Sequence, residues 1–218
     1  MSLLNQVLST AKKTELTDGI HDDCILLAVS NEVRKNKENS PINRNCYTKF
    51  GKLKEGKVVA ESEISWFGLE ALEKGRYNNF FDQIDQLTNI IVTLTGEQEA
   101  FEEKINTIFE EYEIEDIAVL QETLESGKTV KKLMTEIGNA YVTILQGVIG
   151  DKTPIRVKLV FDYKGRNIQA PSYGPVIEKM TVSKEETTLV LTPKELENKL
   201  KSQAAPVINT PTTLISQI

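Results

Sequence analysis

Basic and aromatic side chains gather in two strand-like stretches of the chain, roughly 22–67 and 153–180. Cationic side chains attract phosphate groups, and aromatic rings offer flat faces on which bases can stack. The formal net charge of −6 over 218 residues therefore hides a basic part that is able to bind a polyanion. The aromatic residues of the two stretches are Tyr47, Phe50, Trp66, Phe67, Phe161, Tyr163 and Tyr173.

Strand alternation indicates which of these side chains can reach a ligand. If Phe50 faces the core, Tyr47 and Lys49 point outward together, whereas Trp66 and Phe161 share faces with aliphatic residues and are expected in the core. On the later stretch Arg156 and Lys158 alternate with apolar residues and are expected to be free for phosphate. The predicted nucleic-acid contacts are Arg34, Lys35, Lys37, Arg44, Tyr47, Lys49, Lys52, Arg156, Lys158, Tyr163, Lys164, Arg166 and Tyr173.

Cross-strand ion pairs offer a second explanation for part of this set. Glu61 and Glu63 share one face of their strand and can lie opposite Lys49 and Lys52 in a hairpin. In that case the lysines belong to an ordinary solvated strand face, and no ligand is needed to explain them.

Groups that could carry catalysis are sparse. The one histidine, His21, lies in a turn beside Asp22 and Asp23 and is interpreted as a surface hydrogen-bonding residue. No nucleophile elbow, phosphate-binding loop, dinucleotide fingerprint or zinc-protease motif is present. Cys24 and Cys46 fall in apolar runs and are expected to be two buried thiols, with no metal site and no cofactor. The chain is predicted not to be an enzyme, although scattered carboxylates leave a metal-dependent nuclease as an alternative.

The hydrophobic period predicts β structure, then helices, then β structure again. Residues 24–29 are expected to form a buried strand, and 46–53 with 57–67 a hairpin across Lys54, Glu55 and Gly56. Helical spacing runs from about 77 to 150, on acidic polar faces, with a helix at 115–125 and a last one from Val130. Strands are expected from 155 to 163 and at 187–191, followed by a helix with Thr192 as N-cap and Pro193 in its first turn.

This order predicts an α+β chain: an OB-like antiparallel β-barrel with an acidic helical insertion between strands 3 and 4. A split α+β sandwich is the alternative. No apolar run is long enough for a membrane span and the N-terminus does not resemble a secretory signal, so the cytoplasm is the expected location. The expected segments are an N-terminal arm with a short helix (1–20), a first β half (21–76), the insertion (77–150), a second β half (151–192) and a helix with a tail (193–218).

Two segments resemble the β halves of single-stranded DNA-binding proteins of tailed bacteriophages. They are INRNCYTKFGKLKEGKVVAESEISWF, from Ile42 to Phe67, and IRVKLVFDYKGRNIQAPSYGPVIEKM, from Ile155 to Met180. Proteins of that family have an OB barrel that binds the strand in replication and recombination and often assembles along it. The resemblance implies a groove that contains Arg44, Tyr47, Lys49, Arg156, Lys158, Tyr163, Lys164 and Arg166.

The expected function is therefore non-enzymatic binding of single-stranded DNA, in the host cytoplasm if the chain is phage-encoded. Expected partners are the DNA strand, and further copies of the chain or replication and recombination proteins, with no membrane. One feature departs from the family: many members end in an acidic tail, whereas the last residues here, 213–218, are uncharged. A structural or assembly protein, such as a virion component, is the main alternative.

Overall fold

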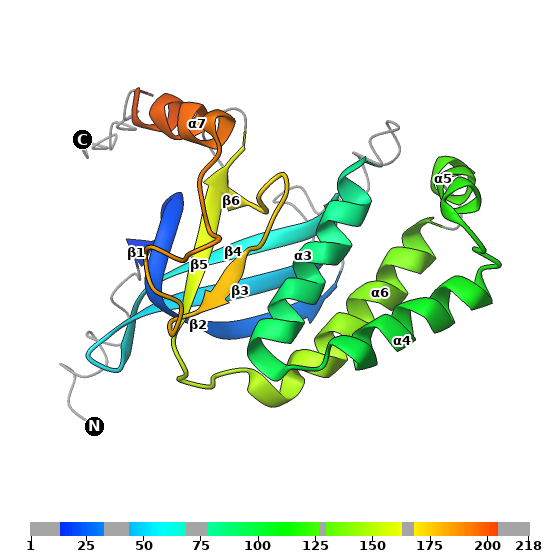
Figure 1. The fold of residues 1–218 in the computed structure, drawn as a ribbon, viewed down its shortest axis with the longest axis horizontal. Helices are drawn as coiled ribbons and strands as arrows, with labels where there is room; N and C mark the ends of the chain where they lie inside the picture. Colours follow the sequence, from blue (N-terminus) through cyan, green and yellow to red (C-terminus); the bar gives the residue numbers. More distant parts are fainter. Residues whose placement is uncertain (1–13, 33–43, 69–77, 127–129, 163–167, 205–218) are drawn as a thin grey trace, which may run out of the picture.

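The computed structural model describes residues 14–32, 44–68, 78–126, 130–162 and 168–204 (Figure 1). Its strands and helices alternate in blocks, with the helices α3 to α6 together beside the strands and α7 at another end of the molecule. The elements are β1 (Thr14–Glu15), β2 (Gly19–Asn31), β3 (Arg44–Lys54), β4 (Lys57–Gly68), α3 (Asn78–Thr95), α4 (Gln98–Glu111), α5 (Ile117–Ser126), α6 (Val130–Leu145), η1 (Gln146–Val148), β5 (Ile155–Phe161), β6 (Ile168–Gln169), β7 (Ile177–Lys179) and α7 (Pro193–Ala204).

Five strands form a nearly closed antiparallel barrel. They pair in the order β4-β3-β2-β5-β6, and the two outer strands, β4 and β6, contact each other. β1 adds to the edge of β4 in parallel, and β7 pairs with β5. β2 is long enough to pair with β3 along one part and with β5 along another, with a register shift in each ladder. Such irregularities bend a strand, which is what closing a small barrel requires.

The β3–β4 hairpin confirms the prediction for 46–53 and 57–67. Both turn residues, Glu55 and Gly56, have positive φ, at 53° and 72°. A two-residue turn of this kind matches the right-handed twist of the flanking strands. Gly56 adopts this conformation without strain. For Glu55, a positive φ has a modest cost in conformational free energy, at an exposed turn.

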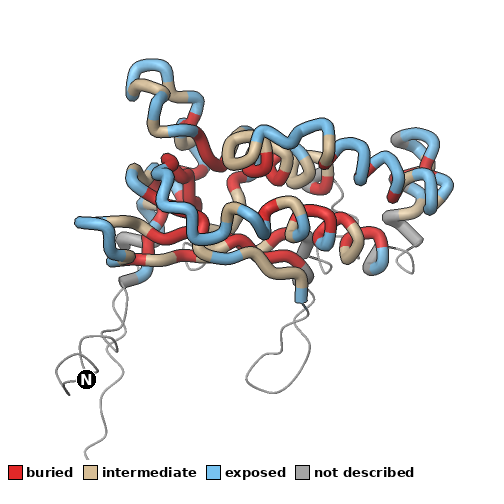
Figure 2. The backbone as a smooth tube through the Cα atoms, turned by 90° about the horizontal axis from the view of Figure 1, so that it is seen from below, coloured by how far each residue is buried: buried red, intermediate tan, exposed pale blue. Residues whose placement is uncertain are grey.

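The predicted helical region is confirmed as helices inserted between the third and fourth barrel strands, β4 and β5. Apolar positions at helical spacing, among them Phe80, Leu87, Phe101, Ile105 and Tyr141, are buried against the barrel and each other. Buried backbone positions gather where helices and strands face one another (Figure 2). In the described part of the chain, no helix is both long and apolar enough to cross a bilayer.

A buried hydrogen-bonded chain joins the barrel to α6. Trp66 Nε1 donates to Thr48 Oγ1 at 2.8 Å, and Thr48 Oγ1 lies 2.9 Å from the Tyr141 hydroxyl of α6. At the end of β2, Asn31 Nδ2 donates to the Thr135 carbonyl at 2.7 Å, on the same helix. A β-carbon at Gly138 would lie 2.7 Å from Asn31 Oδ1, so the side chain of Asn31 needs a glycine here. α6 is therefore fixed against β2 and β3 by specific polar contacts.

The C-terminal part contains one confirmed prediction and one error. α7 begins at Pro193, as predicted, and its start is a reciprocal cap: Glu195 N donates to Thr192 Oγ1 at 3.2 Å, and Thr192 N to Glu195 Oε2 at 2.7 Å. The predicted strand at 187–191 is wrong, because this segment has no regular structure. The side chains of Thr187 and Thr188 bind the Glu178 carboxylate instead, and Leu189 N donates to Thr187 Oγ1.

Candidate nucleic-acid interface

The outer face of the β3–β4 hairpin carries paired charges. Lys49 Nζ lies 2.8 Å from Glu61 Oε1, and Lys49 is the register partner of Glu63. Both side chains of this ion pair are about a third exposed, at 36% and 27%. The cross-strand explanation for Lys49 is thus confirmed, and the cation remains near enough to solvent to exchange its carboxylate for a phosphate. Lys52, farther along β3, is half-buried.

Tyr47 is not presented outward as predicted. It lies on the central strand β3, between Ser30 of β2 and Ser65 of β4 in register, and only 5% of it is exposed. The prediction that Tyr47 offers its ring beside Lys49 is wrong in this respect. The predicted inward face is confirmed, because Cys46, Phe50 and Trp66 are all fully buried.

Arg156 is a buried structural cation rather than a free one. Its Nε donates to Asp22 Oδ1 at 2.6 Å, its Nη1 donates to Glu178 Oε1, and only 4% of its side chain is exposed. Glu178 also accepts from the hydroxyl of Thr187 and from Thr188 N. The expectation that Arg156 is free for phosphate is wrong, because its guanidinium is bound by Asp22 of β2 and by Glu178, its register partner on β7.

Lys158 is buried in the same way, under α7. Its Nζ lies 3.0 Å from Glu195 Oε2, and the two side chains are 4% and 5% exposed. Around this pair, Asn198 Nδ2 donates to the Phe161 carbonyl at 3.4 Å and Lys199 Nζ to the Asp18 carbonyl at 3.4 Å. Lys158 therefore holds the last helix on the barrel, and the prediction that it is free is wrong as well.

The Arg156 cluster predicts acid-sensitive stability. The hydrogen bond from Arg156 lowers the pKa of Asp22; for Glu178, burial acts to raise the pKa, but hydrogen bonds from Thr187 and Arg156 outweigh it and lower it. Both carboxyls thus bind protons less readily in the folded chain, so their contribution is complete above the ordinary values of 3.8 and 4.5. We expect the free energy of unfolding to fall as the pH drops below about 4.5 and through the lowered pKa values.

Urea unfolding at a series of pH values between about 3 and 7 measures this loss. The variant Glu178→Gln should show a flatter pH profile than the wild type. Glu185→Gln, which removes an exposed carboxylate of the neighbouring segment, should keep the wild-type slope. Equal slopes for wild type and Glu178→Gln would contradict the assignment.

His21 is partly buried, and both cysteines are buried. His21 Nε2 lies 2.9 Å from the Thr17 carbonyl, and burial lowers the pKa of the imidazole. Cys24 and Cys46 are buried free thiols, as predicted, and burial raises both pKa values to about 12. Within the described ranges, no group of three or more His, Cys, Asp or Glu side chains could hold a metal ion.

The remaining predicted contacts are two described residues, Tyr173 and Arg44, and six residues outside the described ranges. Tyr173 lies after β6 and is 56% exposed, so its ring can reach a ligand. Arg44 pairs through its backbone with Gly68, at the start of β3. The predicted helix at 1–12, the tail after 204 and six of the contact residues lie outside the described residues. Those six are Arg34, Lys35, Lys37, Tyr163, Lys164 and Arg166.

The sequence did not reveal the acidic residues that pair with Arg156 and Lys158. Glu178 and Glu195, which neutralise Arg156 and Lys158, follow them by 22 and 37 positions, in segments with no strong periodicity. The Thr192–Glu195 spacing of a capping box was the available sign that Glu195 has a fixed place.

Comparison with protein-family models, with curated proteins and with solved structures finds no match.

Proposed function

We propose that the chain is a non-enzymatic single-stranded DNA-binding protein built on an OB-like barrel. The observation that carries the proposal is the strand order. β2 pairs with both β3 and β5, β4 contacts β6, and the helices follow the third barrel strand. Taken as strands 1 to 5, β2 to β6 have the connectivity expected of an OB-fold.

The position of the remaining sequence candidates along the chain also supports the proposal. OB-folds bind oligonucleotides on the face of strands 2 and 3 and with the loops that join strands 1 to 2 and 4 to 5. Here these are the β3–β4 face, with Lys49 and Lys52, and the connections β2–β3 and β5–β6. The two connections contain, by sequence, Arg34, Lys35 and Lys37 in the first and Tyr163, Lys164 and Arg166 in the second.

The proposal assigns different roles to the predicted cations. Lys49 and Lys52 contact phosphates, together with the basic residues of the two connections, and Tyr163 and Tyr173 stack on bases. Arg156 and Lys158 stay in the scaffold, because each is neutralised by a buried carboxylate. Replication and recombination are the processes that the family resemblance suggests.

Fluorescence anisotropy with labelled oligo-dT across a salt series tests the proposal. We expect binding that weakens steeply with salt, because phosphate contacts release counterions, and weaker binding to duplex of the same length. The triple variant Arg34→Gln/Lys35→Gln/Lys37→Gln should lower the slope of log K against log salt by about 2, since each phosphate contact to a single strand contributes roughly 0.7.

The matched control is Lys104→Gln/Lys194→Gln/Lys201→Gln, which removes three exposed cations from α4 and α7. It makes the same change in net charge and should leave the salt slope within error of the wild type. No binding at low salt, equal affinity for duplex, or equal losses in the two triple variants would each overturn the proposal.

One observation favours an assembly function as the second candidate. α7 turns polar side chains, Glu195 and Asn198, toward the barrel, and leaves Leu196 and Leu200 exposed at 45% and 64%. A stable oligomer in light scattering that resists high salt, in a chain without affinity for oligo-dT, would support this function in place of DNA binding.

A further inference from the structure

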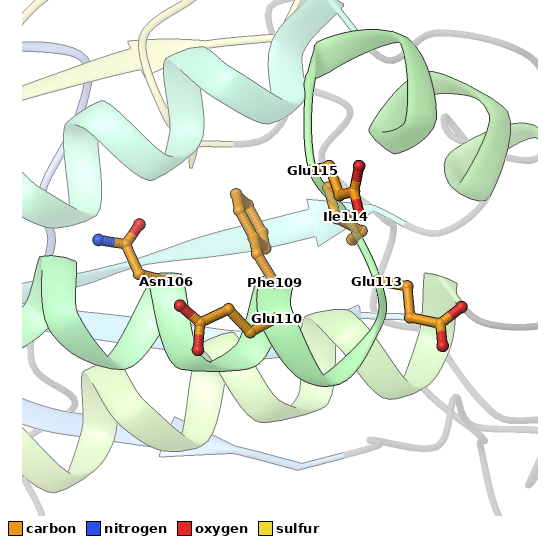
Figure 3. Close-up of a pocket in the computed structure, with 6 residues that line it drawn as sticks. All are labelled: Asn106, Phe109, Glu110, Glu113, Ile114 and Glu115. Carbon is orange, nitrogen blue, oxygen red and sulfur yellow. The ribbon is translucent and has the colours of Figure 1, made fainter.

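A hollow of about 780 Å³ lies where α4 ends and the chain turns toward α5 (Figure 3). Phe109 and Ile114 provide its apolar surface; Phe109 is half-buried, and Ile114 is 8% exposed. Figure 3 shows the Phe109 ring pointing from α4 into the space beside Ile114 and Glu115. The remaining lining residues, all of them exposed, are Asn106, Glu110, Glu113 and Glu115.

The end of α4 fixes this arrangement. Ile114 N donates to the Phe109 carbonyl at 2.8 Å, and Glu113 N to the Glu110 carbonyl at 3.0 Å, with Glu113 at φ 55°. This is the hydrogen-bond pattern with which helices stop at a left-handed residue, and it brings an apolar residue after the stop against one in the last turn. The apolar pair Phe109 and Ile114 is thus held together by backbone bonds, with carboxylates on either side of it.

The surroundings of the hollow are strongly negative. Residues 78–126 contain thirteen Asp and Glu against a single Lys, Lys104, so this part of the chain has a formal charge of −12, whereas the whole chain has −6. Among the described residues, no ion pair neutralises Glu110, Glu113 or Glu115. The pKa of Tyr112, next to the hollow, is raised by burial, by its hydrogen bond to Glu136 and by the charges of Glu136 and Glu111.

We propose that this hollow docks a basic segment of another protein, one in which an apolar side chain is flanked by Lys or Arg. The apolar side chain packs on Phe109 and Ile114, and the flanking cations meet Glu110, Glu113 and Glu115. Charge complementarity selects this occupant: phosphate groups and acidic peptides are repelled by a field of this sign, and the apolar pair gives a basic segment a fixed point of contact. The docking site is independent of the DNA-binding proposal, because α4 and α5 contribute none of the DNA contacts.

The probe is a fluorescein-labelled peptide, Lys-Arg-Leu-Lys-Arg, titrated with the full chain at low salt and followed by anisotropy. A second peptide, Lys-Arg-Gly-Lys-Arg, has the same charge without the apolar side chain. We expect the leucine peptide to bind more tightly than the glycine peptide. The variant Glu110→Gln/Glu113→Gln/Glu115→Gln should bind the leucine peptide about tenfold more weakly than the wild type, which is the effect of losing three partly screened ion pairs.

The matched control is Glu99→Gln/Glu102→Gln/Glu103→Gln, which removes three exposed carboxylates from the same helix outside the hollow. Its affinity for the leucine peptide should be less than about threefold below that of the wild type, which is the effect of longer-range charge alone. Equal losses in both triple variants, equal binding of both peptides, or no binding to the wild type would overturn the proposal. Self-association of the chain that the Glu110 triple variant abolishes, without peptide binding, would overturn it in favour of a second copy as occupant. The affinity for oligo-dT, measured in parallel, should be equal in the two triple variants.

Discussion

The variant Arg156→Ala is expected to lose about 3–5 kcal/mol of the free energy of unfolding, because removing one partner leaves the others buried and unpaired. Glu178, 7% exposed, would lose its charged partner, and Asp22 would lose the 2.6 Å hydrogen bond to the guanidinium. Urea unfolding measures the loss, and Trp66, the single tryptophan, provides the fluorescence signal from a fully buried position.

Lys184→Ala is the control for Arg156→Ala. Lys184 Nζ lies 3.5 Å from the same Asp22 carboxylate, but its side chain is 76% exposed, so its removal should change stability by less than about 0.5 kcal/mol. The measurement also decides between two roles for Arg156. A variant as stable as the wild type that binds oligo-dT ten times more weakly would make Arg156 a phosphate contact, in agreement with the sequence prediction and against the buried cluster.

Lys158→Ala is expected to release α7 from the barrel. The substitution leaves the Glu195 carboxylate buried without its cation, a defect of about 3–5 kcal/mol when both groups stay buried. Because α7 follows the last barrel strand, it can separate while the barrel stays folded, so the observed loss is limited to the free energy with which the helix is docked. Hydrogen exchange should therefore accelerate in residues 193–204, with little change in β2 and β3.

Lys201→Ala is the control on the same helix. Lys201 pairs with Glu197 at 2.7 Å, but the two side chains are 51% and 63% exposed, so α7 should exchange at nearly the wild-type rate. Acceleration spread evenly over barrel and helix would contradict a local role for Lys158, and unchanged exchange in α7 would contradict the buried pair itself.

The parts of the fold that follow from local chemistry were predictable from the sequence. Glu55 and Gly56 between two alternating runs give the hairpin, the helical spacing of Phe101 and Ile105 gives α4, and Thr192 before Pro193 gives the start of α7. Each signal depends on neighbours within a few residues. The short strands β1, β6 and β7, two or three residues each, have no period to detect and exist only through their pairing with longer strands.

The burial of the β5 cations was not predictable from alternation. Val157 and Leu159 do face the core, and Arg156 and Lys158 do point the other way, as expected. Alternation assigns a side chain to a face, but which groups it meets there depends on segments far along the chain, here β7 and α7. The same limit applies to Tyr47, whose face was predicted and whose burial was not. For Lys49, the sequence offered both a ligand contact and a cross-strand ion pair, and only the 2.8 Å distance between Lys49 Nζ and Glu61 Oε1 shows that the pair with Glu61 forms.

Negative charge is concentrated on one side of the described structure. Residues 78–126 have a formal charge of −12, whereas the other described residues, with 15 Lys and Arg against 16 Asp and Glu, have −1, and α3 to α5 lie on one side of the barrel. In the field of a polyanion such a molecule turns before it makes contact, so that the helices trail and the barrel arrives first. Added salt shortens the Debye length and weakens this torque, so the molecule is oriented most strongly at low ionic strength.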